Sequence, residues 1–153
     1  MEYHFIYQMP VGKVAIGQRG DAISILSFDP ADACGALKET PLIRAAARQL
    51  SEFFNGRRHK FDLPLLPDGT EFQQRVWRAL QRIPFGTTKS YGDIAAAIGQ
   101  PNAPHAVGQA VGKNPIAIII PCHRVIAADG GIGGFSSGLP MKRKLMKVEG
   151  IFL

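Results

Sequence analysis

A cysteine and a histidine stand side by side in the segment IIIPCHRVI, residues 118–126. Cysteine attacks carbon as its thiolate, and histidine exchanges protons near neutral pH. Pro121 precedes the pair and interrupts any regular helix or central strand, so it predicts a rigid turn that carries Cys122 and His123. The alternative is a structural thiol packed beside a structural histidine, because most buried thiols pack inertly.

A possible third member of the group lies 27 residues after Cys122, at Glu149. The pattern before it predicts a helix from about Pro140 to Val148, and a carboxylate at a helix C-terminus is unfavourable by about 0.3–1 kcal/mol. Such a placement gains meaning if the carboxylate has a cationic or proton-donating partner. Arg124 is expected to have a structural role instead and to pair with Asp129 in its own loop.

The composition predicts a folded globular protein of one domain or two small ones. The chain has 153 residues, of which 46% are hydrophobic and 20% charged, and no stretch approaches the roughly 18 apolar residues of a membrane span. The start, MEYHFIYQMP, lacks the basic region of a secretion signal. Only Cys34 and Cys122 are cysteines, so we expect a reducing, cytoplasmic or nucleoid-associated environment.

The positive charge is concentrated in the second half of the chain. Residues 1–66 hold 8 Lys and Arg against 7 Asp and Glu, whereas residues 67–153 hold 10 against 5. A basic half indicates an acidic partner, most commonly nucleic acid. The alternative is a solvated basic face that only favours solubility.

Turn residues divide the first half of the chain into strands and one helix. The pattern predicts strands at 3–8, 11–18 and 22–28. A helix is predicted over 42–54, with one apolar face made of Ile43, Ala46, Ala47, Leu50 and Phe54. Pro67, Asp68 and Gly69 then follow one another, which predicts two domains, residues 1–66 and residues 67–153.

The second half begins with helical periodicity from Phe72 to Ile83 and continues with two short helices. Ser90 and Asp93 form a capping-box pattern, and Gly99 fits a helix stop. A second helix is predicted from about Ala103 to Val111. Two short helices joined by a tight turn indicate a helix-turn-helix, although many such hairpins bind nothing.

Two glycine-bearing segments of the second half are unusual. The second short helix contains Gly108 and ends at Gly112, although each glycine within a helix costs about 1 kcal/mol relative to alanine. Close approach of a neighbouring helix or of a nucleic-acid backbone would explain them. Five glycines also lie between residues 130 and 138, where backbone N–H groups could bind a ligand or the loop could simply be flexible.

Together these segments resemble the O6-alkylguanine-DNA alkyltransferase family, the methylated-DNA–protein-cysteine methyltransferases. The resemblance covers about residues 50–150 and rests on FFNGRRHKFDLPL, EFQQRVWRALQRIPFGTTKSYGDIAAAIG, VGKNPIAIIIPCHRVIAADG, GGFSSGL and KLMKVEG. It implies an α/β N-terminal domain of the ribonuclease-H-like type. A mainly helical C-terminal domain with a winged helix-turn-helix would follow.

The resemblance implies direct-reversal DNA repair, in which Cys122 irreversibly accepts the alkyl group of O6-alkylguanine. His123 would take the thiol proton through a water molecule, and Glu149 would hold the histidine. Tyr91 would supply a proton or hydrogen bond at N3 of the leaving guanine. Asn114 would fix the turn that aims the cysteine. Each molecule would react once, because the product is a thioether.

The guanine pocket implied by the resemblance involves the carbonyls of Cys122 and Val125, which would accept from the exocyclic amine. The backbone N–H of Ser136 would contact O6. Phe135 stands where the family often has tyrosine, so the aromatic wall would persist without its hydroxyl.

The implied partner is double-stranded DNA containing O6-alkylguanine, with the damaged nucleotide flipped out of the duplex. The second helix would enter the minor groove through its DNA-binding candidates, which are His105, Ala106, Gly108, Gln109 and Lys113. His105 departs from the pattern, because many members place an arginine there. No metal site is expected, since Cys34, His4 and His59 lack metal-ligand spacing. No organic cofactor and no membrane is expected either, and we expect a monomer.

Two other functions fit parts of the sequence. A sensor module that binds alkylated DNA without transfer activity would share the fold, but family relatives of that kind lack the cysteine. A cysteine hydrolase using Cys122 and His123 is less favoured, because adjacent catalytic pairs are uncommon in hydrolases.

Overall fold

The computed structural model describes the whole chain, from Met1 to Leu153, as two compact units. One unit consists of Met1–Asp68 with Pro115–Ala117, and the other of Gly69–Asn114 with Ile118–Leu153. None of the helices combines the length and apolar character that a membrane span needs. The domains at residues 1–66 and 67–153 stay a prediction, because a division by contacts does not test which part folds alone.

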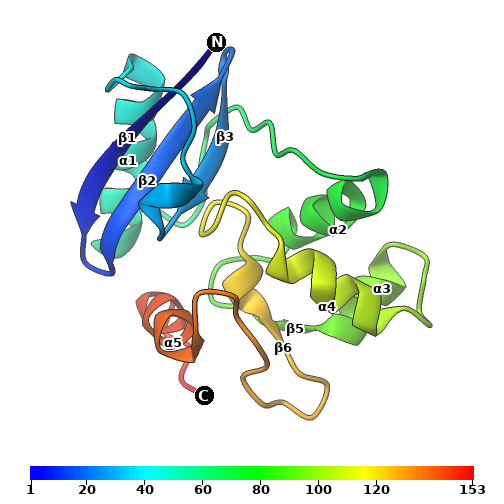
Figure 1. Cartoon of the computed structure of the whole chain (residues 1–153). Coiled ribbons are helices and arrows are strands. Elements are labelled where there is room, and N and C mark those ends of the chain that lie inside the picture. Colours follow the sequence, from blue (N-terminus) through cyan, green and yellow to red (C-terminus); the bar gives the residue numbers. More distant parts are fainter. The chain divides into compact units, whose positions relative to one another are not determined.

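A four-stranded mixed sheet, in the order β3-β2-β1-β4, forms the centre of the first unit (Figure 1). Its strands are β1 (Glu2–Met9), β2 (Gly12–Arg19), β3 (Ala22–Ser27) and β4 (Ala36–Leu37). The three long strands are antiparallel neighbours and confirm the sequence prediction, whereas β4 pairs in parallel with β1. The two residues of β4 are too few to produce a periodic pattern, so it was not predicted. A 3-10 turn, η1 (Pro30–Asp32), precedes β4.

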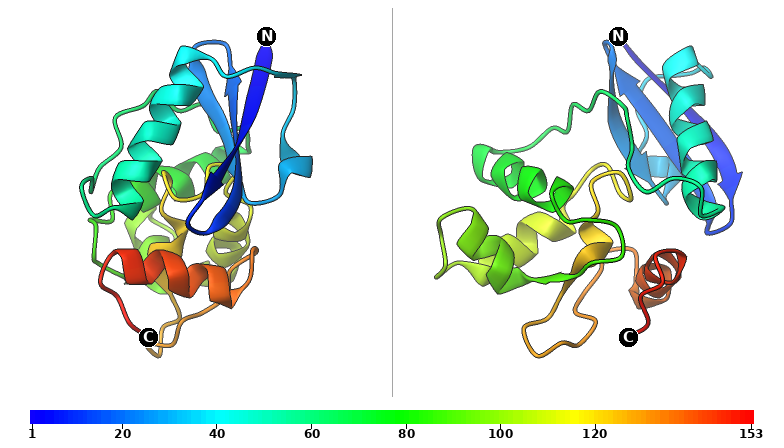
Figure 2. Two further views of the ribbon diagram at one scale, coloured as in Figure 1. Left: turned by 90° about the vertical axis from the view of Figure 1, so that its left-hand side faces the viewer. Right: turned by 180° about the vertical axis from the view of Figure 1, so that it is seen from behind.

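One helix, α1 (Pro41–Phe54), covers one face of this sheet (Figure 2). The Thr40 side chain begins it by accepting the N–H of Ile43 at 3.1 Å. The buried face includes Leu50 and Phe53, both inaccessible to solvent, while the predicted Phe54 is only half-buried. Phe53 follows Leu50 by three residues and Phe54 by four, and both spacings fit the same helix face, so the apolar pattern did not separate them.

The second unit is mainly helical and contains the segments with chemically reactive side chains. Its elements are α2 (Glu71–Gln81), β5 (Lys89–Ser90), α3 (Tyr91–Ala97), α4 (Pro104–Gly112), the 3-10 turn η2 (Cys122–Arg124), β6 (Val125–Ile126) and α5 (Leu139–Val148). The four predicted helices are therefore present, and the predicted α/β class is confirmed, with the sheet found to be a mixed one.

Local sequence explains how α3 and α4 are held. The predicted capping box of Ser90 and Asp93 begins α3, with N–H to Oγ and N–H to carboxylate distances of 3.0 and 2.9 Å. Gly99 adopts a φ of 78° and ends the helix. The helix α2 packs on both helices, and the indole N–H of Trp77 donates to the Ala110 carbonyl at 2.9 Å. The tightly joined helix pair predicted from the sequence is thus fixed to a third helix.

Candidate active site

The turn that carries the cysteine is short and enclosed. All three residues of η2 are buried. The Asn114 side chain holds the approach to this turn, because its Nδ2 donates to the Ile120 carbonyl at 2.7 Å. Ile118 lies two residues before Ile120 and has a φ of 71°. This left-handed conformation costs a β-branched residue about 1–3 kcal/mol. The surrounding packing must therefore fix this backbone firmly.

Cys122 itself is only 6% exposed. Burial raises the pKa of its thiol, because a thiolate loses its hydration there. The hydrogen bond from Asn114 and the charge of Lys142 lower the pKa without outweighing burial. The resting side chain is therefore a protonated thiol, and it needs a base to become a nucleophile.

His123 is fully buried and is the base nearest in sequence. Its Nε2 lies 2.5 Å from Oε2 of Glu149. Because a neutral imidazole carries one N–H, this contact places the proton on Nε2 and makes Nδ1 the accepting nitrogen. Burial lowers the pKa of His123, and the charges of Arg124 and Lys142 add to that effect against the opposing influence of Glu149. The ring is thus neutral at pH 7 and able to accept a proton.

Arg124 does not pair with Asp129, so that prediction was wrong. Its Nε lies 2.8 and 3.0 Å from the two carboxylate oxygens of Glu149, and its Nη1 donates to the Ile83 carbonyl at 2.6 Å. Asp129 instead accepts the N–H of Gly131 at 2.8 Å. Proximity in the sequence favoured the loop aspartate, whereas the fold brings a buried carboxylate from 25 residues away.

The Glu149 carboxylate is satisfied from three directions. Besides His123 and Arg124, the backbone N–H of Gly86 donates to its Oε1 at 2.8 Å. Burial would raise the pKa of Glu149, but the hydrogen bonds from His123, Arg124 and Gly86 hold it well below its usual range. Charge-assisted hydrogen bonds contribute about 1.5–3 kcal/mol each, which exceeds the cost of a carboxylate at the C-terminus of α5. The sequence predicted that Glu149 gains meaning only with a cationic or proton-donating partner, and this carboxylate has both.

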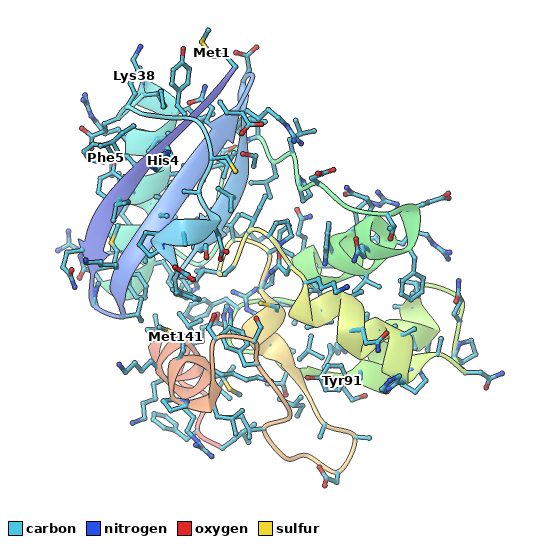
Figure 3. The ribbon with its side chains drawn as sticks, viewed as in Figure 1. Met1, His4, Phe5, Lys38, Tyr91 and Met141 are labelled. Atoms are coloured by element: carbon cyan, nitrogen blue, oxygen red, sulfur yellow. The ribbon has the colours of Figure 1, made fainter.

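Tyr91 reaches the same region from the start of α3. The parallel pairing of β5 with β6 places Ser90 opposite Ile126, which brings the tyrosine close to the cysteine turn. Its side chain points toward the glycine-rich loop (Figure 3), with the hydroxyl 3.5 Å from the Gly134 carbonyl. A Cβ at Gly133 would lie 3.2 Å from this hydroxyl, so a larger residue there would press on it.

Lys142, which the sequence analysis did not single out, links the loop to the cysteine turn. Its side chain is fully buried on α5. The ammonium donates to the carbonyls of Val125 and Ile132 at 2.6 Å and of Gly134 at 3.0 Å. Burial lowers its pKa to about 8, although a thiolate at Cys122 would act in the other direction. Only its position three residues before Leu145, on the buried face of a predicted helix, could have signalled a buried lysine.

The predicted pocket residues lie around this lysine. Val125 is buried and its carbonyl already accepts from Lys142. Phe135 is half-buried and Ser136 exposed in the glycine-rich loop. A carbonyl oxygen has two lone pairs, so the Val125 carbonyl retains the capacity to accept from a ligand.

The predicted DNA-binding residues lie mostly on the exposed side of α4. Four of them, His105, Ala106, Gln109 and Lys113, are exposed, while Gly108 is half-buried. A Cβ at Gly108 would lie 3.6 Å from the Tyr91 ring, an ordinary contact, whereas one at Gly112 would meet nothing within 4 Å. Packing within the chain therefore does not require glycine at either position, which leaves an external surface as an explanation.

Comparisons with known proteins agree on one family. Residues 71–151 match the sequence profile described as "6-O-methylguanine DNA methyltransferase, DNA binding domain". The chain is 44% identical to the methylated-DNA–protein-cysteine methyltransferase of Methanosarcina barkeri, covering 96% of both chains. It is 41% identical to the constitutive protein of that name from Bacillus subtilis, covering 99% of this chain and 97% of the relative. A crystal structure of Mycobacterium tuberculosis OGT in complex with DNA matches with a TM-score of 0.90 and 40% identity, covering 96% of this chain and 92% of the other.

Replacing Lys142 with methionine tests the influence of its charge on the thiol. In a Cys34→Ser background, we expect the rate at which iodoacetamide alkylates Cys122 at pH 7, where Lys142 is still charged, to fall about tenfold, equivalent to ~1.4 kcal/mol. The reason is that the positive charge lowers the pKa of the thiol. Lys144→Met, at an exposed position of the same helix, is the matched control. Identical alkylation rates at pH 7 in the two variants would show that Lys142 does not act on the thiol.

Proposed function

Because the chain belongs to the 6-O-methylguanine DNA methyltransferase family, we propose that it repairs DNA by transferring the alkyl group of O6-alkylguanine to Cys122. The observation that carries this proposal is the buried thiol beside a neutral histidine whose Nε2–H is held by Glu149. The reaction is a methylated-DNA–protein-cysteine methyltransferase reaction. Direct reversal needs no excision of the damaged base.

The transfer moves one proton, one alkyl group and one electron pair. His123 Nδ1 takes the thiol proton through a water molecule, and Glu149 stabilises the resulting imidazolium. The Cys122 sulfur attacks the alkyl carbon, a C–S bond forms, and the bond from that carbon to O6 breaks. The electron pair passes into the guanine ring system, where Tyr91 supplies a proton or hydrogen bond at N3. The thioether is stable, so the protein is consumed stoichiometrically.

The base would be recognised by backbone groups around the cysteine turn. The carbonyls of Cys122 and Val125 accept from the exocyclic amine, each through a lone pair beyond the hydrogen bond that it already makes in the protein. The N–H of Ser136 contacts O6, and Phe135 forms the aromatic wall. Asn114 keeps the turn in place through the Ile120 carbonyl.

The exposed side of α4 would face the minor groove of double-stranded DNA while the damaged nucleotide is flipped into the pocket. Ala106 and Gly108 allow close approach, and Gln109 and Lys113 supply polar and cationic contacts. In this proposal α3 and α4 form a winged helix-turn-helix, and the first unit is a ribonuclease-H-like domain. The protein acts as a monomer in the cytoplasm or on the nucleoid.

The direct test is the mass of the intact protein after incubation with a duplex containing one O6-methylguanine. We expect a gain of one methyl group in the wild type and in Cys34→Ser, and no gain in Cys122→Ser. Cys34 is the appropriate control because it is the exposed thiol of the chain. Binding of the duplex without any gain in mass would support a non-catalytic sensor, and a methyl group on Cys34 would contradict the assigned nucleophile.

A second prediction concerns His105, where many family members have arginine. The histidine is exposed, and its Nε2 lies 3.5 Å from Nε2 of Gln109. An arginine is longer and permanently charged, so it should fill the gap left by a flipped base more effectively. We expect His105→Arg to raise the single-turnover repair rate at subsaturating duplex by about tenfold, equivalent to ~1.4 kcal/mol. Lys113→Arg serves as a control for added guanidinium character on α4. An unchanged or lower rate in His105→Arg would refute this role.

A further inference from the structure

Three arginines line a cleft between α2 and the end of α3. The cleft has a volume of about 220 Å³. Its walls are formed by Arg75, Arg78, Ala79, Arg82, Ala97 and Ile98. The arginines follow one another at intervals of three and four residues, which places them on one face of α2.

None of the three arginines forms an ion pair, and Glu71, four residues before Arg75 on the same helix, does not pair with it. The ion pairs of the structure involve Arg44, Arg58, His123 and Arg124, and none involves an arginine of the cleft. Like charges three and four residues apart destabilise an isolated helix. The helix dipole favours cations at the C-terminal end of α2, which accounts for Arg78 and Arg82 but not for Arg75 in the middle of the helix.

Arg75 fixes the cleft relative to the helix pair. Its guanidinium donates to the carbonyl of Ile98, the residue that ends α3 and begins the turn to α4. Ala79 and Ala97 are small and leave room between the guanidinium groups. Arginine presents several N–H donors in a fixed planar arrangement that matches the oxygens of a phosphate.

The dimensions of DNA explain why a phosphate would reach this cleft. A helix with its side chains is about 10–12 Å across, while the minor groove is about 6 Å wide. A helix such as α4 therefore cannot sink completely between the two backbones. Phosphates at the groove edge then lie beside α4, within reach of elements that pack against it, and α2 packs against both α3 and α4.

We propose that the cleft of Arg75, Arg78 and Arg82 binds a backbone phosphate of the DNA beside the groove that receives α4. This inference rests on the proposed function for the placement of α4. It assigns to α2 a contact outside the helix pair and outside the reacting centre, which strengthens binding without reading the base sequence.

The salt dependence of binding to an undamaged duplex tests the proposal without requiring alkyl transfer. The logarithm of the binding constant falls with the logarithm of salt concentration by about 0.9 per neutralised phosphate. We expect Arg78→Gln/Arg82→Gln to reduce this slope by about 1. Arg143→Gln/Lys144→Gln removes the same charge from exposed positions of α5 and should leave the slope unchanged. Equal slopes in the two double variants would overturn the proposal, and unfolding curves establish that both are folded.

Neutral methylphosphonates placed one at a time along each strand then locate the contact. One position should weaken binding of the wild type severalfold and have no effect on Arg78→Gln/Arg82→Gln. If every position weakens both proteins equally, the cleft binds no specific phosphate. The wild-type protein could gain no methyl group in the mass measurement and still show a methylphosphonate effect that depends on Arg78 and Arg82. That result would refute the proposed function and leave the phosphate site in the cleft standing.

Discussion

The buried carboxylate of Glu149 is the interaction on which the second unit depends. It receives Arg124 and His123 from the cysteine turn and the N–H of Gly86 from the segment after α2, while it ends α5 itself. Through Arg124 the same group reaches the Ile83 carbonyl. Loss of one partner of such a buried pair costs about 3–5 kcal/mol, because the other charge remains without compensation. The same carboxylate therefore holds the fold of the second unit together and positions the base of the active site.

The distribution of charge around this carboxylate sets the state of the reactive groups. Arg124 balances Glu149, so His123 need not be protonated to compensate the carboxylate and can serve as a base. Lys142 supplies positive charge on the side of the thiol. The site thus holds a neutral thiol and a neutral histidine in surroundings that favour the ion pair formed when the proton moves. This arrangement protects the cysteine at rest and lowers the cost of activating it.

Sequence patterns were sufficient wherever a local signal existed. The capping box of Ser90 identified the start of α3, and the spacing of apolar residues identified α1, α2 and α5. The adjacency of Cys122 and His123, with Glu149 at an unfavourable helix end, pointed to the reacting group. Arg124 was misassigned because its partner is distant in sequence and the nearby Asp129 offered a local alternative. Lys142 was missed because three backbone carbonyls satisfy it, and backbone acceptors leave no trace in the sequence.

A ¹⁵N NMR titration of the His123 ring measures directly whether this residue rests as a neutral base. At pH 7 we expect a neutral ring with its proton on Nε2. Protonation should occur only below the ordinary pKa of about 6.5, because burial and Arg124 lower the pKa of this group. In Arg124→Gln the midpoint should move to higher pH. An imidazolium at pH 7 in the wild type, or an Nδ1–H tautomer, would show that His123 cannot accept the thiol proton through Nδ1.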